Sequence, residues 1–270
     1  MPGMNEKDRA AIAANRHAWD VAAPEHLKSA DWQAQLTGFA TPGHSTFDET
    51  MTALLRSEGL AGKSVVQPCC NNGRELLSLA AFGAGRCLGI DQSAAFLAQA
   101  ETLRAVAGSD ATFLCADIYA LPDHVPRDFD VALLTIGVLN WMPNLARFFG
   151  AVAGLVKPGG RLLIYETHPF LELFDPGSES PMTLARSYFD EEPVVEEDSI
   201  TYDGSTGGET APNYWFVHRI GQILNALIGA GFVLRRMDEY PHSNREVEYD
   251  IYEGQEAQPP MCYTLVAEKS

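Results

Sequence analysis

From residue 63 onward, short apolar runs alternate along the chain with longer segments in which apolar positions recur at helical spacing. The short runs predict strands at residues 65–66, 87–90, 111–115, 131–136, 161–165, 233–237 and 261–267. The periodic segments predict helices at residues 75–82, 94–107, 145–156 and 220–229. Strands that alternate with helices need crossover connections. The pattern therefore predicts a doubly wound α/β fold with a mainly parallel, seven-stranded sheet.

The N-terminal part of the chain comes before this alternation. Residues 1–60 predict a helical cover, with helices at residues 10–19 and 46–57 and a loop at residues 38–44. The α/β domain is expected to span residues 61–270.

A second region interrupts the alternation after the fifth strand. Residues 171–212 contain Pro176-Gly177, Thr206-Gly207-Gly208 and a run of acidic residues that is typical of a solvated loop. A long irregular segment inside a compact fold usually has a function. We therefore expect an insertion near the carboxyl edge of the sheet, either a lid or a short antiparallel ribbon.

The charge balance argues against two classes of partner. The chain has 19 Lys+Arg against 36 Asp+Glu, a formal net charge of −17, and no basic cluster. Such a chain repels a phosphate backbone and an anionic bilayer, so we expect neither nucleic acid nor membrane as a partner. Residues 1–9 lack the apolar core of a signal peptide, and no apolar run approaches the ~20 residues of a membrane span. We expect a cytoplasmic protein, either a monomer or a homodimer.

The five cysteines do not form a recognisable metal site. Cys69 and Cys70 are adjacent, no pair has metal-site spacing, and no histidine cluster accompanies them. Cys87, Cys115 and Cys262 lie in or beside apolar segments, where a free thiol behaves as a small hydrophobe. We expect structural thiols and no bound metal.

The stretch from Ser64 to Gly73, followed by Asp91, has the layout of a nucleotide-binding βαβ unit. A buried strand leads into a tight turn that opens a helix, and a second strand ends in the carboxylate of Asp91. A carboxylate at this position can accept hydrogen bonds from both hydroxyls of a ribose. Only Gly73 remains of the usual turn glycines, so this motif alone does not identify the nucleotide.

Three later motifs follow in order along the chain. Ala116-Asp117-Ile118-Tyr119 follows the third strand, Phe129-Asp130 leads into the fourth, and a Lys-Pro-Gly-Gly turn at residues 157–160 precedes the fifth. With the first turn and Asp91, this ordered set resembles the class I S-adenosylmethionine (SAM) dependent methyltransferases, whose fold is Rossmann-like. The resemblance covers residues 62–168.

A narrower resemblance is to a bacterial branch of that family. The branch has an Asn-x-x-x-Trp segment near the N-terminus and a first turn that contains glutamine or cysteine. It also has Gly-x-x-x-Trp-x-Pro after the fourth strand, Glu-x-His-Pro after the fifth, and Trp-x-x-His before a later helix. This chain matches these motifs at residues 15–19, 67–73, 137–143, 166–169 and 215–218.

The resemblance implies that SAM is the cofactor and S-adenosylhomocysteine (SAH) the product. It places cofactor contacts in the N-terminal segment, in the first turn and near the ends of the second, third and fourth strands. These residues are Trp19, Gln67, Cys69, Asn71, Gly73, Asp91, Gln92, Asp117, Ile118, Tyr119 and Thr135. Trp19 and His26 would fold over SAM as a cover, and Asp117 would meet the adenine amino group.

The first turn departs from the family pattern at three positions. Family members usually have an acidic residue where this chain has Gln67, and glycines where it has Cys69 and Asn71. Gln67 can still accept a hydrogen bond from the cofactor's ammonium, and Asn71 tolerates positive φ better than most residues. SAM has no pyrophosphate, so a glycine-poor turn disfavours a dinucleotide more than it disfavours SAM.

The acceptor is expected above the carboxyl ends of the fourth and fifth strands. The candidate catalytic residues there are Asn140, Tyr165, His168 and His218. Methyl transfer is an in-line displacement, so a base is needed only when the acceptor must lose a proton. His168 can be that base or can orient Glu166. His218 can be a base or a helix cap, and Asn140 can orient the substrate.

Three functions follow from these motifs. The first is a methyltransferase of specialised metabolism that acts on an O, N or C nucleophile of a small molecule. The second is an enzyme that consumes SAM without methylation: the amino nitrogen attacks the γ-carbon, which forms azetidine-2-carboxylate and releases methylthioadenosine (MTA). The altered turn at Gln67 motivates this reading, because it changes the amino acid end of the pocket. The third is a non-catalytic SAM-binding protein.

Overall fold

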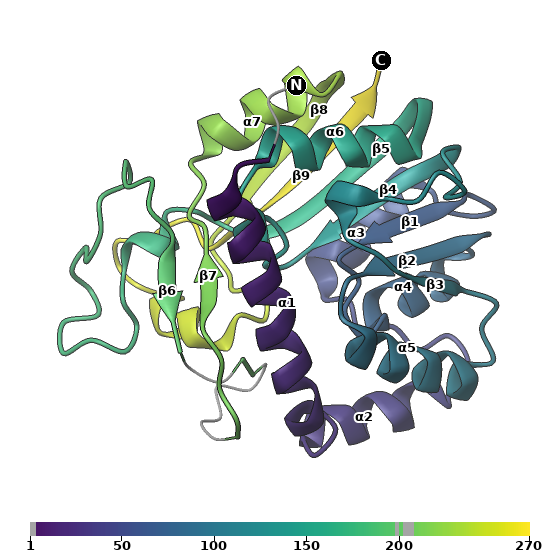
Figure 1. Cartoon of the computed structure of the whole chain (residues 1–270), viewed down its shortest axis with the longest axis horizontal. Coiled ribbons are helices and arrows are strands. Elements are labelled where there is room, and N and C mark those ends of the chain that lie inside the picture. The colour runs from purple at the N-terminus through teal and green to yellow at the C-terminus, as the bar shows by residue number, and fades with distance from the viewer. Residues whose placement is uncertain (1–3, 198–199, 202–207) are drawn as a thin grey trace.

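The computed structural model describes residues 4–197, 200–201 and 208–270, and a seven-stranded sheet forms its centre (Figure 1). The strands are β1 (Val65–Pro68), β2 (Cys87–Asp91), β3 (Thr112–Cys115), β4 (Phe129–Thr135), β5 (Val156–Thr167), β8 (Phe232–Tyr240) and β9 (Cys262–Lys269). They lie in the order β3-β2-β1-β4-β5-β9-β8, and only β9 is antiparallel to its neighbours. The predicted doubly wound, mainly parallel sheet is confirmed.

The strand order reverses at β1. From β1 the chain moves outward through β2 and β3 on one side, and β4 and β5 then follow on the other side. Helices leave such a sheet in opposite directions at this point, so a crevice opens beyond the carboxyl ends of β1 and β4. The turn after β1, Asp91 and Asp117 lie at this end of the sheet, whereas Phe129-Asp130 and the Lys-Pro-Gly-Gly segment lie at its other end.

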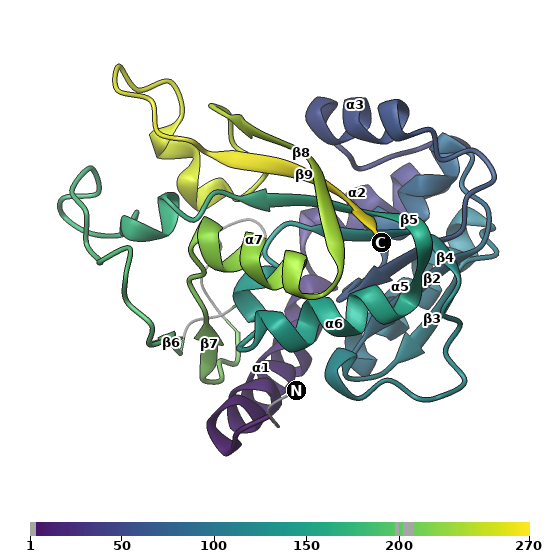
Figure 2. The same cartoon turned by 90° about the horizontal axis from the view of Figure 1, so that it is seen from above.

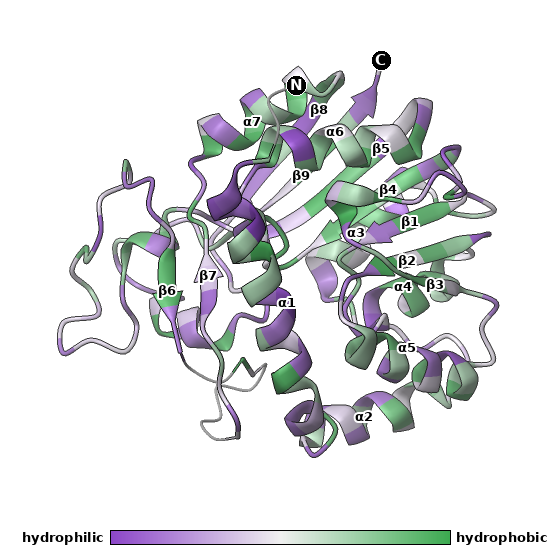
Figure 3. Ribbon diagram, viewed as in Figure 1, coloured by the Kyte–Doolittle hydropathy of each residue, from purple (hydrophilic) through white to green (hydrophobic). Residues whose placement is uncertain are grey.

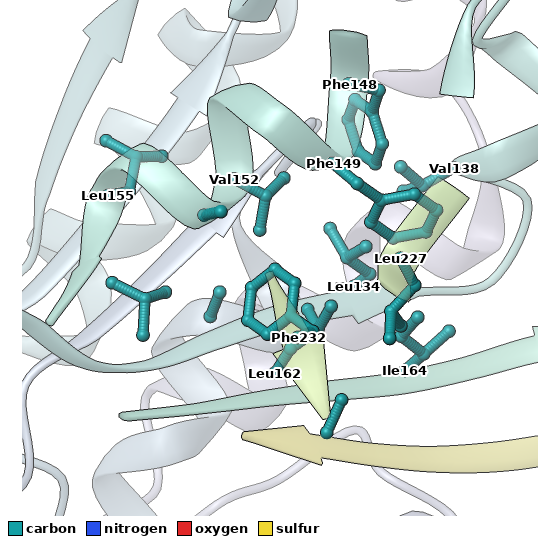
Figure 4. Packing of buried hydrophobic residues seen from close by; sticks show 14 of the residues in the cluster. Leu134, Val138, Phe148, Phe149, Val152, Leu155, Leu162, Ile164, Leu227 and Phe232 are labelled. Carbon is teal, nitrogen blue, oxygen red and sulfur yellow. The ribbon is translucent and has the colours of Figure 1, made fainter. Parts of the chain in front are cut away.

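Helices cover both faces of the sheet (Figure 2). Helices α6 (Leu145–Leu155) and α7 (Ile220–Gly229) pack on one face, where Phe148, Phe149 and Leu227 meet the apolar side chains of the central strands (Figure 4). The other face is covered by α2 (Ala30–Phe39), α3 (Glu49–Glu58), α4 (Arg74–Ser78) and α5 (Ala94–Ala107). Figure 3 shows the resulting hydrophobic colouring of β1 and β4.

The N-terminal part is more helical than its sequence pattern predicts. Helix α1 spans Glu6–His26, because Asn5 caps its first turn by accepting a hydrogen bond from the backbone N–H of Asp8. Helix α2 is absent from the predicted elements. Ser29 caps it, and its buried side chains Trp32 and Phe39 pack against the sheet, a tertiary contact that its short sequence pattern does not reveal.

Two predicted boundaries inside the α/β domain also shift. The helix expected at residues 75–82 ends after one turn and a half at Ser78 and continues as the 3₁₀ helix Leu79–Phe82. Strand β5 begins at Val156, before the Lys-Pro-Gly-Gly segment that we expected to precede it.

In the described part of the chain, no helix is long and apolar enough to cross a membrane.

The insertion forms a ribbon in its described part. Strand β6 (Val194–Glu196) pairs antiparallel with β7 (Asn213–Trp215), and Figure 1 shows α1 beside this ribbon. Asn15 of α1 joins β7 through both of its amide atoms. The predicted turn at Thr206-Gly207 lies outside the described residues.

Candidate cofactor and acceptor site

The turn after β1 holds three residues in the left-handed region. Cys69 has φ 55°, Asn71 has φ 50° and Gly73 has φ 73°. The expectation that Asn71 replaces a glycine at positive φ is confirmed, and Cys69 does the same with less suitable chemistry. A Cβ at Gly73 would lie 2.6 Å from the ring of Phe113, so glycine is required there. Such strain persists where the surrounding fold imposes it, often at binding sites.

Asp91 ties this turn to the end of β2. Its Oδ2 accepts a hydrogen bond from the N–H of Asn71 at 2.8 Å, and its Oδ1 accepts one from the N–H of Ser93 at 2.9 Å. Burial raises the pKa of the Asp91 carboxyl, and these backbone donors oppose that shift. Each carboxylate oxygen has a second acceptor site, so Asp91 can still receive hydrogen bonds from a ribose.

Gln67 and Thr135 meet across the point where the strand order reverses. The Nε2 of Gln67 at the end of β1 donates to the Oγ1 of Thr135 at the end of β4, at 3.1 Å. Gln67 is 1% exposed, and its Oε1 is buried without a hydrogen-bond partner among the described residues. A buried acceptor normally has a donor. The orphaned oxygen therefore fits a donor group of a bound ligand, as the ammonium of SAM would provide.

The predicted adenine contacts lie at the carboxyl ends of β2 and β3. Asp117 caps the 3₁₀ helix Ile118–Ala120, because its Oδ1 accepts a hydrogen bond from the N–H of Tyr119 at 2.9 Å. Ile118 packs into the core, and the hydroxyl of Tyr119 donates to the carbonyl oxygen of Asn144 at 3.3 Å. The carbonyl oxygen of Gln92 accepts from the thiol of Cys115.

Helix α1 covers this end of the sheet with aromatic side chains. The ring centroid of Trp19 lies 5.3 Å from that of Phe96 at the start of α5 and 5.2 Å from that of Trp141 after β4. Trp141 in turn lies 5.0 Å from Trp215 of the ribbon, at 90°. His26 packs on Phe96 at 5.0 Å. Trp19 thus joins the start of α5 to the loop after β4.

Glu166 fixes the loop that follows β4. Its carboxylate accepts hydrogen bonds from the N–H groups of Gly137 and Leu139, and only 2% of the residue is exposed. Burial raises the pKa of this carboxyl to about 8. His168 makes other contacts: its Nε2 lies 2.8 Å from Glu239, and its Nδ1 accepts from the N–H of Phe170.

Glu172 is a functional candidate that the sequence reasoning missed. Its Oε1 accepts from Asn140 Nδ2 at 3.3 Å, and its Oε2 accepts from Trp215 Nε1 at 2.8 Å and from the hydroxyl of Tyr249 at 3.2 Å. Glu172 is 3% exposed, and burial raises its pKa to about 7. The one available signal was an acidic residue between two leucines at residues 171–173, at the start of the predicted insertion.

The four predicted catalytic residues do not converge. Asn140 belongs to the network around Glu172. Tyr165 lies on the opposite face of β5 from Glu166 and donates to Asp48 Oδ2 at 2.6 Å. His218 Nε2 donates to the carbonyl oxygen of Met142 at 2.8 Å, and burial lowers the His218 pKa to about 4.

Thiols and acidic groups complete the inventory of the site. The five cysteines are free, and burial raises the pKa of the Cys69 thiol well above its usual range. Within the described ranges, no group of three or more His, Cys, Asp or Glu side chains could hold a metal ion.

Comparisons with known proteins identify a domain family and similar folds. Residues 66–164 match the family model described as a methyltransferase domain. An S-adenosylmethionine dependent methyltransferase from Mesorhizobium loti is similar at 22% identity and TM-score 0.54, over 80% of this chain and 96% of its own. The PH0226 protein from Pyrococcus horikoshii is similar over 99% of this chain and 100% of its own, at 15% identity and TM-score 0.58.

A third similar structure contains a cofactor product. It is the glycopeptide N-methyltransferase MtfA complexed with SAH, at 14% identity and TM-score 0.54, over 84% of this chain and 90% of its own. No curated protein matches the chain. Residues 66–164 therefore form a methyltransferase domain, and the solved structures show that the chain shares the fold of SAM-dependent methyltransferases.

Proposed function

We propose that this protein transfers the methyl group of SAM to an O, N or C nucleophile of a small molecule, in specialised metabolism. The observation that carries this proposal is the orphaned Gln67 Oε1 at the reversal point between β1 and β4, beside the positive-φ turn. A buried acceptor there suits the ammonium of SAM. Asp91 at the end of β2 suits its ribose.

The protein's own residues position the reactants. SAM, when bound, supplies an electrophilic methyl group on a sulfonium. Glu166 holds the loop after β4 in place, and Glu172 orients Asn140 and Trp215 at the acceptor side. The aromatic side chains of Trp19 and Trp141 exclude water. Positioning of this kind is the main catalytic contribution that an in-line displacement requires.

The cover and the charge support a small acceptor. Helix α1 and the β6–β7 ribbon are tied together at Asn15 and lie over the crevice. A formal net charge of −17 disfavours nucleic acid and anionic membrane as partners. We further propose that the enzyme is cytoplasmic and acts as a monomer or homodimer. We also propose His168, His218 and Tyr165 as catalytic residues. The imidazole of His168 contacts the carboxylate of Glu239 and not that of Glu166.

A second candidate function is the conversion of SAM itself to azetidine-2-carboxylate. The observation that favours it is the neutral amide of Gln67 in place of a carboxylate. A carboxylate would stabilise the ammonium, whereas this reaction needs a neutral amine. The amine lone pair would form a bond to the γ-carbon, the C–S bond pair would move to sulfur to give MTA, and the nitrogen would lose a proton. A non-catalytic SAM-binding protein would form neither product.

Incubation with SAM alone, followed by mass spectrometry of the adenosine products, separates these functions. The methyltransferase proposal predicts no turnover until an acceptor is added, and SAH afterwards. Formation of MTA in the absence of an acceptor would contradict the methyltransferase proposal and support the second function. Failure of both SAM and SAH to raise the melting temperature at saturating concentration would contradict all three functions, because a ligand of the native state must stabilise it.

A further inference from the structure

We propose that the loop at residues 243–246, between β8 and β9, binds the α-carboxylate at the methionine end of SAM. Asn244 and Arg245 would donate to that carboxylate, while Gln67 accepts from the neighbouring ammonium. This inference rests on the proposed function, because it requires SAM in the crevice beyond β1 and β4. No sequence motif predicts a role for this loop.

Three side-chain groups of the loop are buried without partners among the described residues: Ser243 Oγ, Asn244 Nδ2 and Arg245 Nε. Asn244 is 1% exposed; its Oδ1 accepts from Thr167 Oγ1 at 3.2 Å, and its Nδ2 has no partner. The Nε of Arg245 is likewise buried and unpartnered. Leaving a buried donor unsatisfied is costly. Orphaned donors and one orphaned acceptor, Gln67 Oε1, at the same end of the sheet supply the acceptor and donor groups that an amino acid zwitterion needs.

The sheet places these groups on one face at one end. Gln67 bonds to Thr135, and Thr135 is the register partner of Tyr165 on β5. Thr167 lies two residues further along β5, so it shares that face, and it holds Asn244. Strands β1, β4 and β5 are adjacent, and neighbouring strands lie about 4.8 Å apart. Gln67 and the Thr167 that holds Asn244 therefore lie on one face at the carboxyl end of the sheet, two strand spacings or about 10 Å apart.

The loop at residues 243–246 is anchored to α4, the helix that follows the turn after β1. Arg245 has φ 81°, an unfavourable value for arginine. Its Nη2 donates to Glu75 Oε1 at 3.1 Å and its Nη1 to the carbonyl oxygen of Thr46 at 3.0 Å. Glu75 also accepts from Arg74 Nε at 2.9 Å, directly after Gly73. These contacts hold the guanidinium beside the start of α4 and maintain the strained backbone.

The alternation of side chains along β5 places Thr167, which holds Asn244, on the opposite face of the sheet from Glu166. Glu166 and Thr167 are consecutive on β5 and point to opposite faces. Glu166 faces the loop that carries Asn140 and Trp141, whereas Thr167 faces Asn244. Asn244 therefore lies on the Gln67 face of the sheet, while Glu246 of the same loop is near enough to Glu166 and Glu172 to raise the pKa of both carboxyls.

The test compares three ligands by calorimetry on the full chain: SAH, its decarboxylated analogue, and MTA, which lacks the amino acid end. Asn244→Asp keeps the acceptor for Thr167 and puts a negative charge against the carboxylate. We expect it to weaken SAH binding about tenfold or more, since hydrogen bonds to charged groups are strong. Binding of MTA should change less than about twofold, and the decarboxylated analogue should bind the variant at least as well as wild type.

Two further variants keep this test decisive. Asn225→Asp adds the same charge at an exposed position of α7 and should leave all three affinities unchanged. Arg245→Lys keeps the charge and removes Nε, so it should weaken SAH severalfold without affecting MTA, even if Asn244→Asp does not fold. Equal losses for SAH and MTA, or unchanged SAH binding in both variants, would overturn the inference. If wild type binds neither SAH nor MTA, the proposed function fails and the inference fails with it.

Discussion

Asn15 of α1 pairs with Tyr214 of β7 as a strand residue would. Its Nδ2 donates to the Tyr214 carbonyl oxygen at 2.9 Å, and its Oδ1 accepts from the Tyr214 N–H at 2.7 Å. One side chain thus satisfies both backbone groups of a residue 199 positions away. Four residues further along the same helix, Trp19 reaches the aromatic cluster over the crevice.

Replacement of Asn15 by Ala should loosen this cover. Both backbone groups of Tyr214 lose their partner, which should lower the free energy of unfolding by about 1–3 kcal/mol. SAH should also dissociate faster, because α1 and the ribbon no longer close together. Chemical denaturation and stopped-flow release of SAH measure the two effects. Arg16→Ala, an exposed neighbour on α1, is the control; equal effects in the two variants would contradict the role of Asn15.

Asp91→Ala should weaken SAH binding by roughly 10- to 100-fold. The change removes the acceptor for the ribose hydroxyls, and it also frees the N–H of Asn71, which Asp91 holds in the turn. Calorimetry with SAH measures the loss. The exposed Asp110 provides a matched control as Asp110→Asn. Unchanged affinity in Asp91→Ala would remove the ribose assignment.

Glu172→Gln should affect the acceptor more than the cofactor. Glutamine cannot accept from all three donors, so Asn140, Trp215 and Tyr249 lose their common anchor. We expect the KM of the acceptor to rise severalfold while the Kd of SAH stays within about twofold. Glu179→Gln, an exposed change in the same insertion, serves as the control. A parallel loss of SAH affinity would show that Glu172 supports the whole fold instead.

The stability of the protein should fall between pH 7 and pH 8. Burial raises the pKa of Glu166 from 4.5 to about 8, so the folded protein keeps a proton that the unfolded chain has lost. The free energy of unfolding therefore decreases as pH rises toward 8, by on the order of 1 kcal/mol per pH unit. Denaturation at the two pH values measures this slope. Glu166→Gln should flatten it, and an unchanged slope in that variant would assign the titration elsewhere.

Local signals predicted the sheet and the conformation of the turn after β1. The apolar patterns that predict strands and helices are formed by residues close together in sequence, and Asp91 is the last residue of its own strand. The sequence also predicted that the turn after β1 forms without its usual glycine, because asparagine is one of the few residues that adopt positive φ readily. These features depend on neighbours within about thirty residues.

The remaining parts depend on contacts between distant segments. Glu172 acquires its role only when Asn140, Trp215 and Tyr249 converge on it. Asn244 lies 77 residues from its partner Thr167. No spacing rule joins such positions. The predicted insertion, whose acidic run is typical of a solvated loop, therefore also contains a buried carboxylate, that of Glu172.

The most direct test of the central claim follows an isotopic label in the methyl group of SAM. The enzyme is incubated with labelled SAM and a library of small nucleophiles, and the products are analysed by mass spectrometry. The account predicts a labelled acceptor together with an equal amount of unlabelled SAH. Label that appears in MTA, in the absence of any acceptor, would contradict it.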